Sequence, residues 1–169
     1  MFSNADLRKL IFPLIVEQIL AVSVGMVDTM MVSSVGEAAT SGVSLVDMIN
    51  TLFINIFAAV ATGGAVVSSQ YLGQKRRDRA CQSADQLLII TGMLSLGIMI
   101  LCILFRKGFL SLIYQGVAED VMRNARVYLV ISALSYPFLS VYNSCAALFR
   151  SMGNSKISMQ ASIIMNVIN

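Results

Sequence analysis

Two carboxylates, Glu17 and Asp28, stand inside the first long apolar stretch of the sequence. Their spacing of 11 residues is close to three turns of an α-helix, which would put both on one face, about 16 Å apart along the axis. Ionisable side chains at membrane depth are costly, and they commonly mark ion or substrate pathways. We therefore expect both carboxylates to face protein or water; the alternative is that each is a solvated helix end.

Among the polar side chains within apolar stretches, four are further candidates: Tyr136, Asn143, Asn166 and Asn169. Asn166 and Asn169 are three residues apart, so in a helix they would point the same way. Together they could hydrogen-bond another helix or coordinate a cation. Tyr136 and Asn143 are candidates to line a cavity, although Tyr136 precedes Pro137 and a packing kink is the simpler interpretation of that pair.

The sequence shows no nucleophile–base or metal-binding constellation. The sequence contains no His, which excludes His-based metal sites and His-based nucleophilic triads. Its three cysteines, Cys81, Cys102 and Cys145, follow neither a metal-binding nor a disulfide spacing, and we interpret them as packing residues. We therefore expect neither an enzyme nor a cofactor, and no metal site beyond a possible Na⁺ at Asp28.

Composition places the candidate residues in a membrane protein. Of the 169 residues, 57% are hydrophobic and only 12% are charged, and the mean hydropathy is +0.78. A soluble domain carries about 25% charged residues, so this chain cannot cover a water-facing surface, and a lipid bilayer is its expected main solvent. The net charge of +3 comes without a basic face bearing aromatic residues, which argues against a nucleic-acid partner.

Five apolar stretches must position the polar candidates. A helix needs about 20 apolar residues to cross the hydrocarbon core, so four stretches are long enough and the fifth is only the start of a span. None alternates apolar and polar residues as a strand would. We predict an all-α, polytopic transmembrane helix bundle of four full spans and part of a fifth. The expected spans are approximately residues 10–32, 48–70, 86–105, 127–149 and 157–169.

The basic residues predict the orientation of this bundle. With the N-terminus in the cytoplasm, eight Lys and Arg side chains lie in inside segments and four in outside segments. That asymmetry follows the positive-inside rule. We therefore expect a multi-pass protein of the plasma (inner) membrane with a cytoplasmic N-terminus. The inside set is Arg8, Lys9, Lys75, Arg76, Arg77, Arg79, Arg150 and Lys156; the outside set is Arg106, Lys107, Arg123 and Arg126.

Glycines and an amphipathic segment predict how the spans are joined. Gly73 is expected to cap the second helix, residues 151–155 to form a tight turn, and Gly63-Gly64 to be a close-packing point between helices. Residues 109–126 are expected to lie along the outer interface before the fourth span. The apolar side of that segment would carry Leu110, Ile113, Tyr114 and Val117.

Six short motifs, in order along the whole chain, resemble the multidrug and toxic compound extrusion (MATE) transporters. Each motif is weak by itself, and their order and spacing carry the resemblance. The motifs are Val27-Asp28-Thr29, Val35-Gly36-Glu37-Ala38-Ala39, Ser44-Leu45-Val46-Asp47, Ala61-Thr62-Gly63-Gly64, Ser69-Gln70-Tyr71-Leu72-Gly73 and Leu148-Phe149-Arg150-Ser151-Met152-Gly153-Asn154.

The resemblance implies a twelve-helix exporter of two six-helix lobes, of which residues 1–169 would be an incomplete N-terminal lobe. Such a protein exports small organic cations or amphiphilic compounds against inward H⁺ or Na⁺, and its partners would be the bilayer and the missing C-terminal lobe. Asp28 is similar to the first-helix acid of the family's cation site. Asn169 resembles the Asn of an Asn-x-x-x-Asp pattern in the fifth helix, with Asn166 beside it, and that Asp would lie beyond the present end. Glu17 and Asp47 match subgroup features without a defined role, and we place them as possible cavity-lining residues.

Two alternatives to an exporter remain. A lipid-linked oligosaccharide flippase of the same superfamily would share the helices and lobes, but it usually lines its cavity with several cationic residues, and the spans here contain none. A non-transport structural membrane module is the other alternative.

Overall fold

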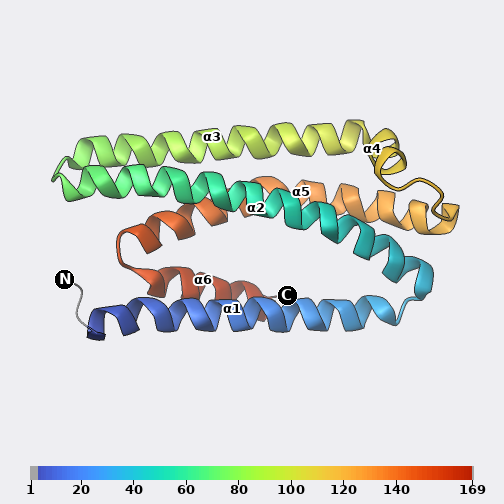
Figure 1. Cartoon of the computed structure of the whole chain (residues 1–169), viewed down its shortest axis with the longest axis horizontal. Helices are drawn as coiled ribbons and strands as arrows, with labels where there is room; N and C mark the ends of the chain where they lie inside the picture. Colours follow the sequence, from blue (N-terminus) through green and yellow to red (C-terminus); the bar gives the residue numbers. More distant parts are fainter. Residues whose placement is uncertain (1–3, 169) are drawn as a thin grey trace.

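Six α-helices make up the part of the chain that this computed structural model describes, residues 4–168, with side chains except at 4–7, 9, 10, 165, 166 and 168 (Figure 1). Those residues contain no β-strand, so the predicted all-α fold is confirmed. The helices are α1 (Asn4–Ser33), α2 (Glu37–Gly73), α3 (Arg77–Leu104), α4 (Arg106–Ile113), α5 (Glu119–Ser151) and α6 (Ser155–Ile168).

Four of these helices are long and apolar enough to cross a membrane, as predicted: α1, α2, α3 and α5. Each begins before its expected apolar stretch. The largest difference is in α2, which starts at Glu37 rather than near Met48. Hydropathy marks only the residues that can lie in hydrocarbon, whereas a helix continues through polar turns as long as its backbone hydrogen bonds are made.

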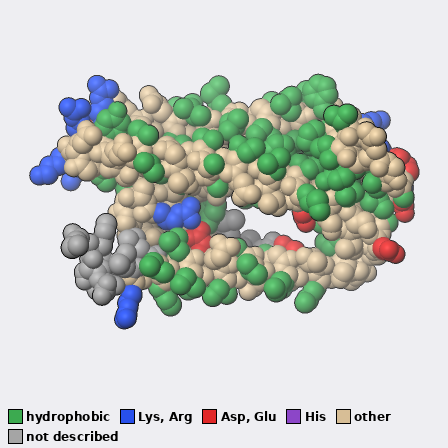
Figure 2. All heavy atoms as spheres, viewed as in Figure 1, with side chains coloured by type: hydrophobic (Ala, Val, Ile, Leu, Met, Phe, Trp, Pro, Cys, Tyr) green, Lys and Arg blue, Asp and Glu red, His purple; other side chains and the backbone are tan. Residues whose placement is uncertain are grey.

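The helices form two layers (Figure 1). Helices α2, α3 and α5 pack against one another in one layer, with α4 linking α3 to α5, and α1 and α6 lie side by side in the other. The start of α1 and the turns 74–76 and 152–154 lie at one end, which we call the basic end, and the turn 34–36 lies at the other. Figure 2 shows a hollow between the two layers, with acidic and basic side chains at its rim.

The core fills the space between α2, α3, α4 and α5. Phe57, Ala133 and Tyr136 are fully or almost fully buried, and so are Leu110 and Leu129 nearer to α4. By contrast, many large apolar side chains on the outer faces are exposed, including Phe138 and Met30. Such a surface requires an apolar solvent, which agrees with a chain that lies in a bilayer.

Small and hydroxyl side chains bring the helices close together. A Cβ on Gly42 of α2 would lie 2.9 Å from the Val121 carbonyl oxygen of α5, and a Cβ on Gly64 would overlap Leu87 of α3. The predicted close-packing point therefore holds for Gly64. It does not hold for Gly63, because a Cβ there would meet nothing within 4 Å. Between α3 and α5, the hydroxyls of Thr91 and Ser144 are hydrogen-bonded at 2.9 Å, fully buried.

Two details of the linkers differ from the prediction. Gly73 is the last residue of α2 and does not cap it: the left-handed residue of that turn is Lys75, with φ +62°. In the amphipathic segment, Leu110 is buried and Tyr114 and Val117 pack on the core, but Ile113 is 47% exposed. Ile113 is three positions after Leu110 in α4, about 60° away around the helix axis, so it lies at the edge of the buried face. The tight turn at 151–155 is present, with Gly153 at φ +78°.

Candidate functional site

One face of α1 lines two separate pockets. The α1 residues that line them recur every three or four positions, which is the spacing of one helix face. Several other α1 side chains, including Phe12, Ile19 and Met26, are strongly exposed. The face consists of Leu14, Glu17, Gln18, Ala21 and Val24 at one pocket and of Gly25, Asp28, Thr29 and Val32 at the other. Glu17 and Asp28 therefore share a helix face but belong to different pockets.

The pocket at Asp28, which we call the Asp28 pocket, lies between α1, α2 and α5 and has a volume of about 250 Å³. It holds two carboxylates, Asp28 and Asp47, both of them exposed to it. The polar oxygens around them come from four hydroxyl side chains, those of Thr29, Thr40, Ser44 and Tyr128. This is a set of hard oxygen atoms with two negative charges, which suits H⁺ or Na⁺.

Hydrogen bonds fix the second carboxylate of this pocket. The Tyr128 hydroxyl of α5 donates to Oδ1 of Asp47 at 3.0 Å, and the Asn50 side-chain amide donates to the same oxygen at 3.4 Å. Asn50 in turn accepts a hydrogen bond of 2.7 Å from the Tyr136 hydroxyl. The Asp47 side chain is therefore held from α2 and α5 through its Oδ1 atom.

Tyr136 supports this chain of hydrogen bonds from behind the pocket. It is 1% exposed, and its ring packs against Phe53 and Phe57 with centroid distances of 5.5 and 5.9 Å. Because the ring is enclosed by core side chains, its hydroxyl has a fixed direction toward Asn50. Tyr136 thus connects the core to the Asp28 pocket and does not itself line that pocket.

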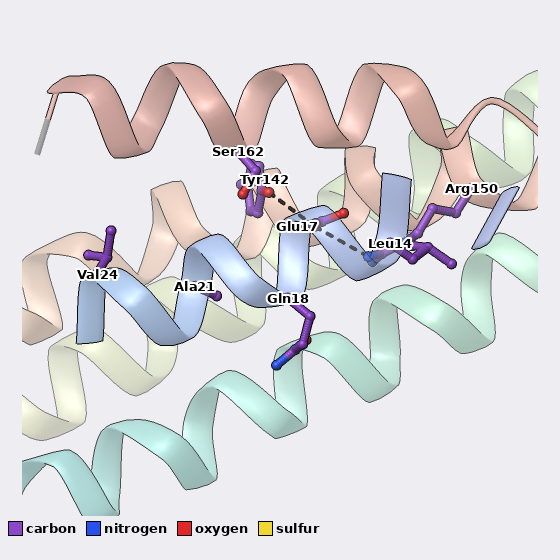
Figure 3. Close-up of a pocket in the computed structure, with 8 residues that line it drawn as sticks. All are labelled: Leu14, Glu17, Gln18, Ala21, Val24, Tyr142, Arg150 and Ser162. Carbon is purple, nitrogen blue, oxygen red and sulfur yellow. Dashed lines mark hydrogen bonds and ion pairs between the residues drawn. The ribbon is translucent and has the colours of Figure 1, made fainter. Parts of the chain in front are cut away.

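The second pocket, which we call the Glu17 pocket, has a volume of about 360 Å³ and lies between α1, α5 and α6 (Figure 3). Figure 3 shows Tyr142 and Arg150 of α5 directed toward Glu17, with Ser162 of α6 beside Tyr142. On the α1 side, the Glu17 pocket is lined by the apolar Leu14 and the polar Gln18.

Glu17 contacts side chains from two other helices. The Ser158 hydroxyl of α6 donates to Oε2 at 2.9 Å, and the Tyr142 hydroxyl of α5 donates to Oε1 at 3.4 Å. The Arg150 guanidinium lies 3.6 Å from Oε1. The Glu17 side chain is 16% exposed and that of Arg150 34%. A carboxylate with this little contact with water is stabilised by an opposite charge and by hydroxyl donors, and Glu17 has both.

The remaining predicted site residues lie elsewhere. Asn143 is half-buried on α5 and lines neither pocket. The side chain of Asn166 and the whole of Asn169 lie outside the described residues. Within the described part of the chain, no three His, Cys, Asp or Glu side chains converge as metal ligands.

Sequence reasoning did not identify Tyr128, Tyr142, Ser158 or the inward role of Arg150. Tyr128 and Tyr142 are 14 residues apart, close to four helical turns, and that spacing was the available signal for one polar face of α5. Arg150 was assigned to an inside loop, yet it belongs to the last turn of α5 and lines the Glu17 pocket.

Comparison with known proteins identifies the family to which the chain belongs. The family model MatE matches residues 13–169, which is nearly the whole chain. A relative described as the uncharacterized transporter YisQ of Bacillus subtilis (strain 168) is 28% identical over 165 residues, covering 97% of this chain. The chain spans 36% of the length of that relative. The chain belongs to the MatE family, as its sequence motifs predicted.

Proposed function

We propose that this chain is part of a secondary active exporter that moves small organic cations or amphiphilic compounds out of the cell against inward H⁺ or Na⁺. The Asp28 pocket is its site for the coupling cation. The observation that carries the proposal is that Asp28 of α1 and Asp47 of α2 line one pocket. Family membership and the relative described as a transporter support the transport class.

The chemistry of the Asp28 pocket favours a small cation. Two carboxylates that face the same space repel each other, and an added positive charge offsets that repulsion. Carboxylate and hydroxyl oxygens are suitable ligands for Na⁺, and either carboxylate is a suitable acceptor for H⁺. The family resemblance would add the amide oxygens of Asn166 and Asn169 to this set.

Cation binding at this pocket would bias the arrangement of the helices. The pocket is built from α1 of one layer and from α2 and α5 of the other. A cation held between the layers therefore favours the arrangement in which its ligands are closest, and its release favours the other. In the complete transporter, this change would be coupled to substrate release together with the C-terminal lobe.

The orientation proposed for the exporter follows from its basic end. The described basic residues Lys75, Arg76, Arg77 and Arg79 lie at or beside the turn 74–76, and the positive-inside rule then puts that end in the cytoplasm. The flippase alternative predicts several cationic side chains in a cavity. In the two pockets described above, Arg150 is the single cationic lining residue, and it lies beside Glu17.

Gradient-driven export tests the proposal. Everted membrane vesicles are prepared from cells that express the protein from its own gene. A fluorescent organic cation is then added to the solution outside the vesicles. A H⁺ gradient is imposed in one arm of the experiment and a Na⁺ gradient in the other. One of the two gradients should drive uptake of the dye into the vesicles, and collapsing that gradient should stop the uptake. Dye uptake in neither arm above that of vesicles without the protein would contradict cation coupling.

A further inference from the structure

The Glu17 pocket lies between the two layers, far from the turn 34–36 that connects α1 to α2. Figure 1 shows α1 and α2 converging at the turn 34–36 and diverging toward the basic end. Glu17 lies well before that turn on α1, and its partner Arg150 lies in the last turn of α5. The ion pair between Glu17 and Arg150 thus joins α1 to α5 far from the turn 34–36, at the end where the turn 152–154 joins α5 to α6.

The geometry of this ion pair is loose. Charge-assisted hydrogen bonds between a guanidinium and a carboxylate are usually about 2.7–2.9 Å long, whereas Arg150 Nη1 and Glu17 Oε1 are 3.6 Å apart. The Glu17 carboxylate makes its shorter contact, 2.9 Å, with Ser158 of its own layer. The contacts across the layers, to Arg150 and to Tyr142 at 3.4 Å, are the longer ones.

If the pair separated, both charges would still have polar surroundings. Arg150 is the more exposed partner and carries a long side chain, so it can turn toward water at the basic end. Glu17 would keep the hydroxyl of Ser158, which moves with α1 because α1 and α6 pack together. A conformational switch requires an element that has two arrangements, and polar groups would surround both charges in each of them.

We propose that Glu17 and Arg150 form a latch that holds α1 against α5, and that its release opens the Glu17 pocket toward the basic end. Tyr142 is the third member of the latch, since its hydroxyl contacts Glu17 from the same helix as Arg150. Among the described side chains, the charged and titratable groups that face Glu17 are Arg150 and Tyr142 of α5, and α6 contributes the hydroxyls of Ser158 and Ser162. The inference concerns the opening of a pocket and does not depend on which cation drives transport.

Thiol labelling inside the pocket tests the latch. Cys81, Cys102 and Cys145 are replaced by alanine, and Ala21→Cys places a small reporter in the pocket wall, one turn from Glu17. The labelling rate is then measured in permeable membranes with a small hydrophilic thiol reagent. Residues that couple two conformations typically shift their balance by about 2- to 30-fold, so we expect Glu17→Gln and Arg150→Gln each to raise the rate by a factor in that range.

A double-mutant cycle separates a latch from two independent effects. If the two side chains act through each other, the Glu17→Gln/Arg150→Gln variant should label no faster than the faster single variant. The matched control is Glu119→Gln, which removes the 2.9 Å pair between Arg126 and Glu119 within α5 and should leave the rate unchanged.

Three outcomes would overturn the latch: single variants that label at the parental rate, a double variant in which the two effects multiply, or an equal increase in the control. If a single variant fails to reach the membrane, the labelling rate of Tyr142→Phe is the deciding measurement. This variant removes one cross-layer hydrogen bond and no charge. Faster labelling in Tyr142→Phe supports the latch, and an unchanged rate overturns it. Because the reporter is pocket access and not export, a failed transport assay leaves this result intact.

Discussion

The hydroxyl of Tyr128 donates a hydrogen bond to Oδ1 of Asp47 over 3.0 Å, joining α5 to α2 at the edge of the Asp28 pocket. This contact fixes a carboxylate that the sequence alone left without a role. Three helices therefore contribute to the proposed cation site, because Asp28 comes from α1. The position of Asp47 then depends on how α2 and α5 pack.

Removing this hydrogen bond should weaken cation binding without abolishing it. In Tyr128→Phe the ring remains, and Asp47 keeps only the longer contact from Asn50. A hydrogen bond to a charged group contributes about 1.5–3 kcal/mol, so the cation concentration for half-maximal export should rise by roughly 10-fold or more. Tyr71→Phe, the same change outside both pockets, is the control. An unchanged half-maximal concentration in Tyr128→Phe would remove Asp47 from the cation site.

The turn between α2 and α3 should face the cytoplasm. A single cysteine introduced by Gln74→Cys, in a background without the three native cysteines, should resist membrane-impermeant thiol reagents in intact cells. The reagent should react once the cells are made permeable, which controls for a cysteine that is merely unreactive. Labelling in intact cells would mean that the basic end faces outward.

The close approach of α2 and α5 should make Gly42 intolerant of a side chain. A methyl group at Gly42 would meet backbone atoms of α5 at 2.9 and 3.0 Å, which can be relieved only by moving a helix. Overpacking of this kind costs about 1–3 kcal/mol, so Gly42→Ala should lower the thermal unfolding midpoint in detergent.

Gly63→Ala is the matched control on the same helix. Its methyl group would meet nothing within 4 Å, and Ala is favoured over Gly inside a helix by about 1 kcal/mol. The midpoint of this variant should stay the same or rise slightly. Equal loss in both variants would show that the close contact between Gly42 and α5 does not control stability.

The sequence predicted the helices well because the bilayer requires the same pattern from every span. Apolar stretches of sufficient length marked α1, α2, α3 and α5, and the spacing of Glu17 and Asp28 correctly indicated a shared face of α1. Helix starts were predicted poorly. Polar turns such as residues 37–47 of α2 lack the apolar signal yet remain helical.

Partners between helices could not be predicted, since they depend on packing that a single sequence does not encode locally. The contact between Tyr128 and Asp47 joins residues 81 positions apart, and the one between Ser158 and Glu17 joins residues 141 apart. The buried pair of Thr91 and Ser144 was missed for the same reason: Ser and Thr are common in apolar helices, and only their facing positions make them interhelical contacts.

Replacing Asp28 by Asn tests the proposed coupling site most directly. Asn preserves the size and hydrogen-bonding capacity of the side chain but cannot ionise. It also removes a charge that costs up to about 2.5–3.5 kcal/mol inside a membrane helix, so the protein level should not fall. A ligand shifts two conformations only through its different affinities for them, and for H⁺ or Na⁺ that difference should largely disappear.

The measurement is gradient-driven export of a fluorescent organic cation by Asp28→Asn in the protein expressed from its own gene, at matched membrane levels. Asp85→Asn, at an exposed position of α3 outside both pockets, controls for the loss of one carboxylate. We expect export to fall to the background of vesicles without the protein in Asp28→Asn and to remain at the parental rate in Asp85→Asn. Parental export by Asp28→Asn would contradict a coupling site in the Asp28 pocket.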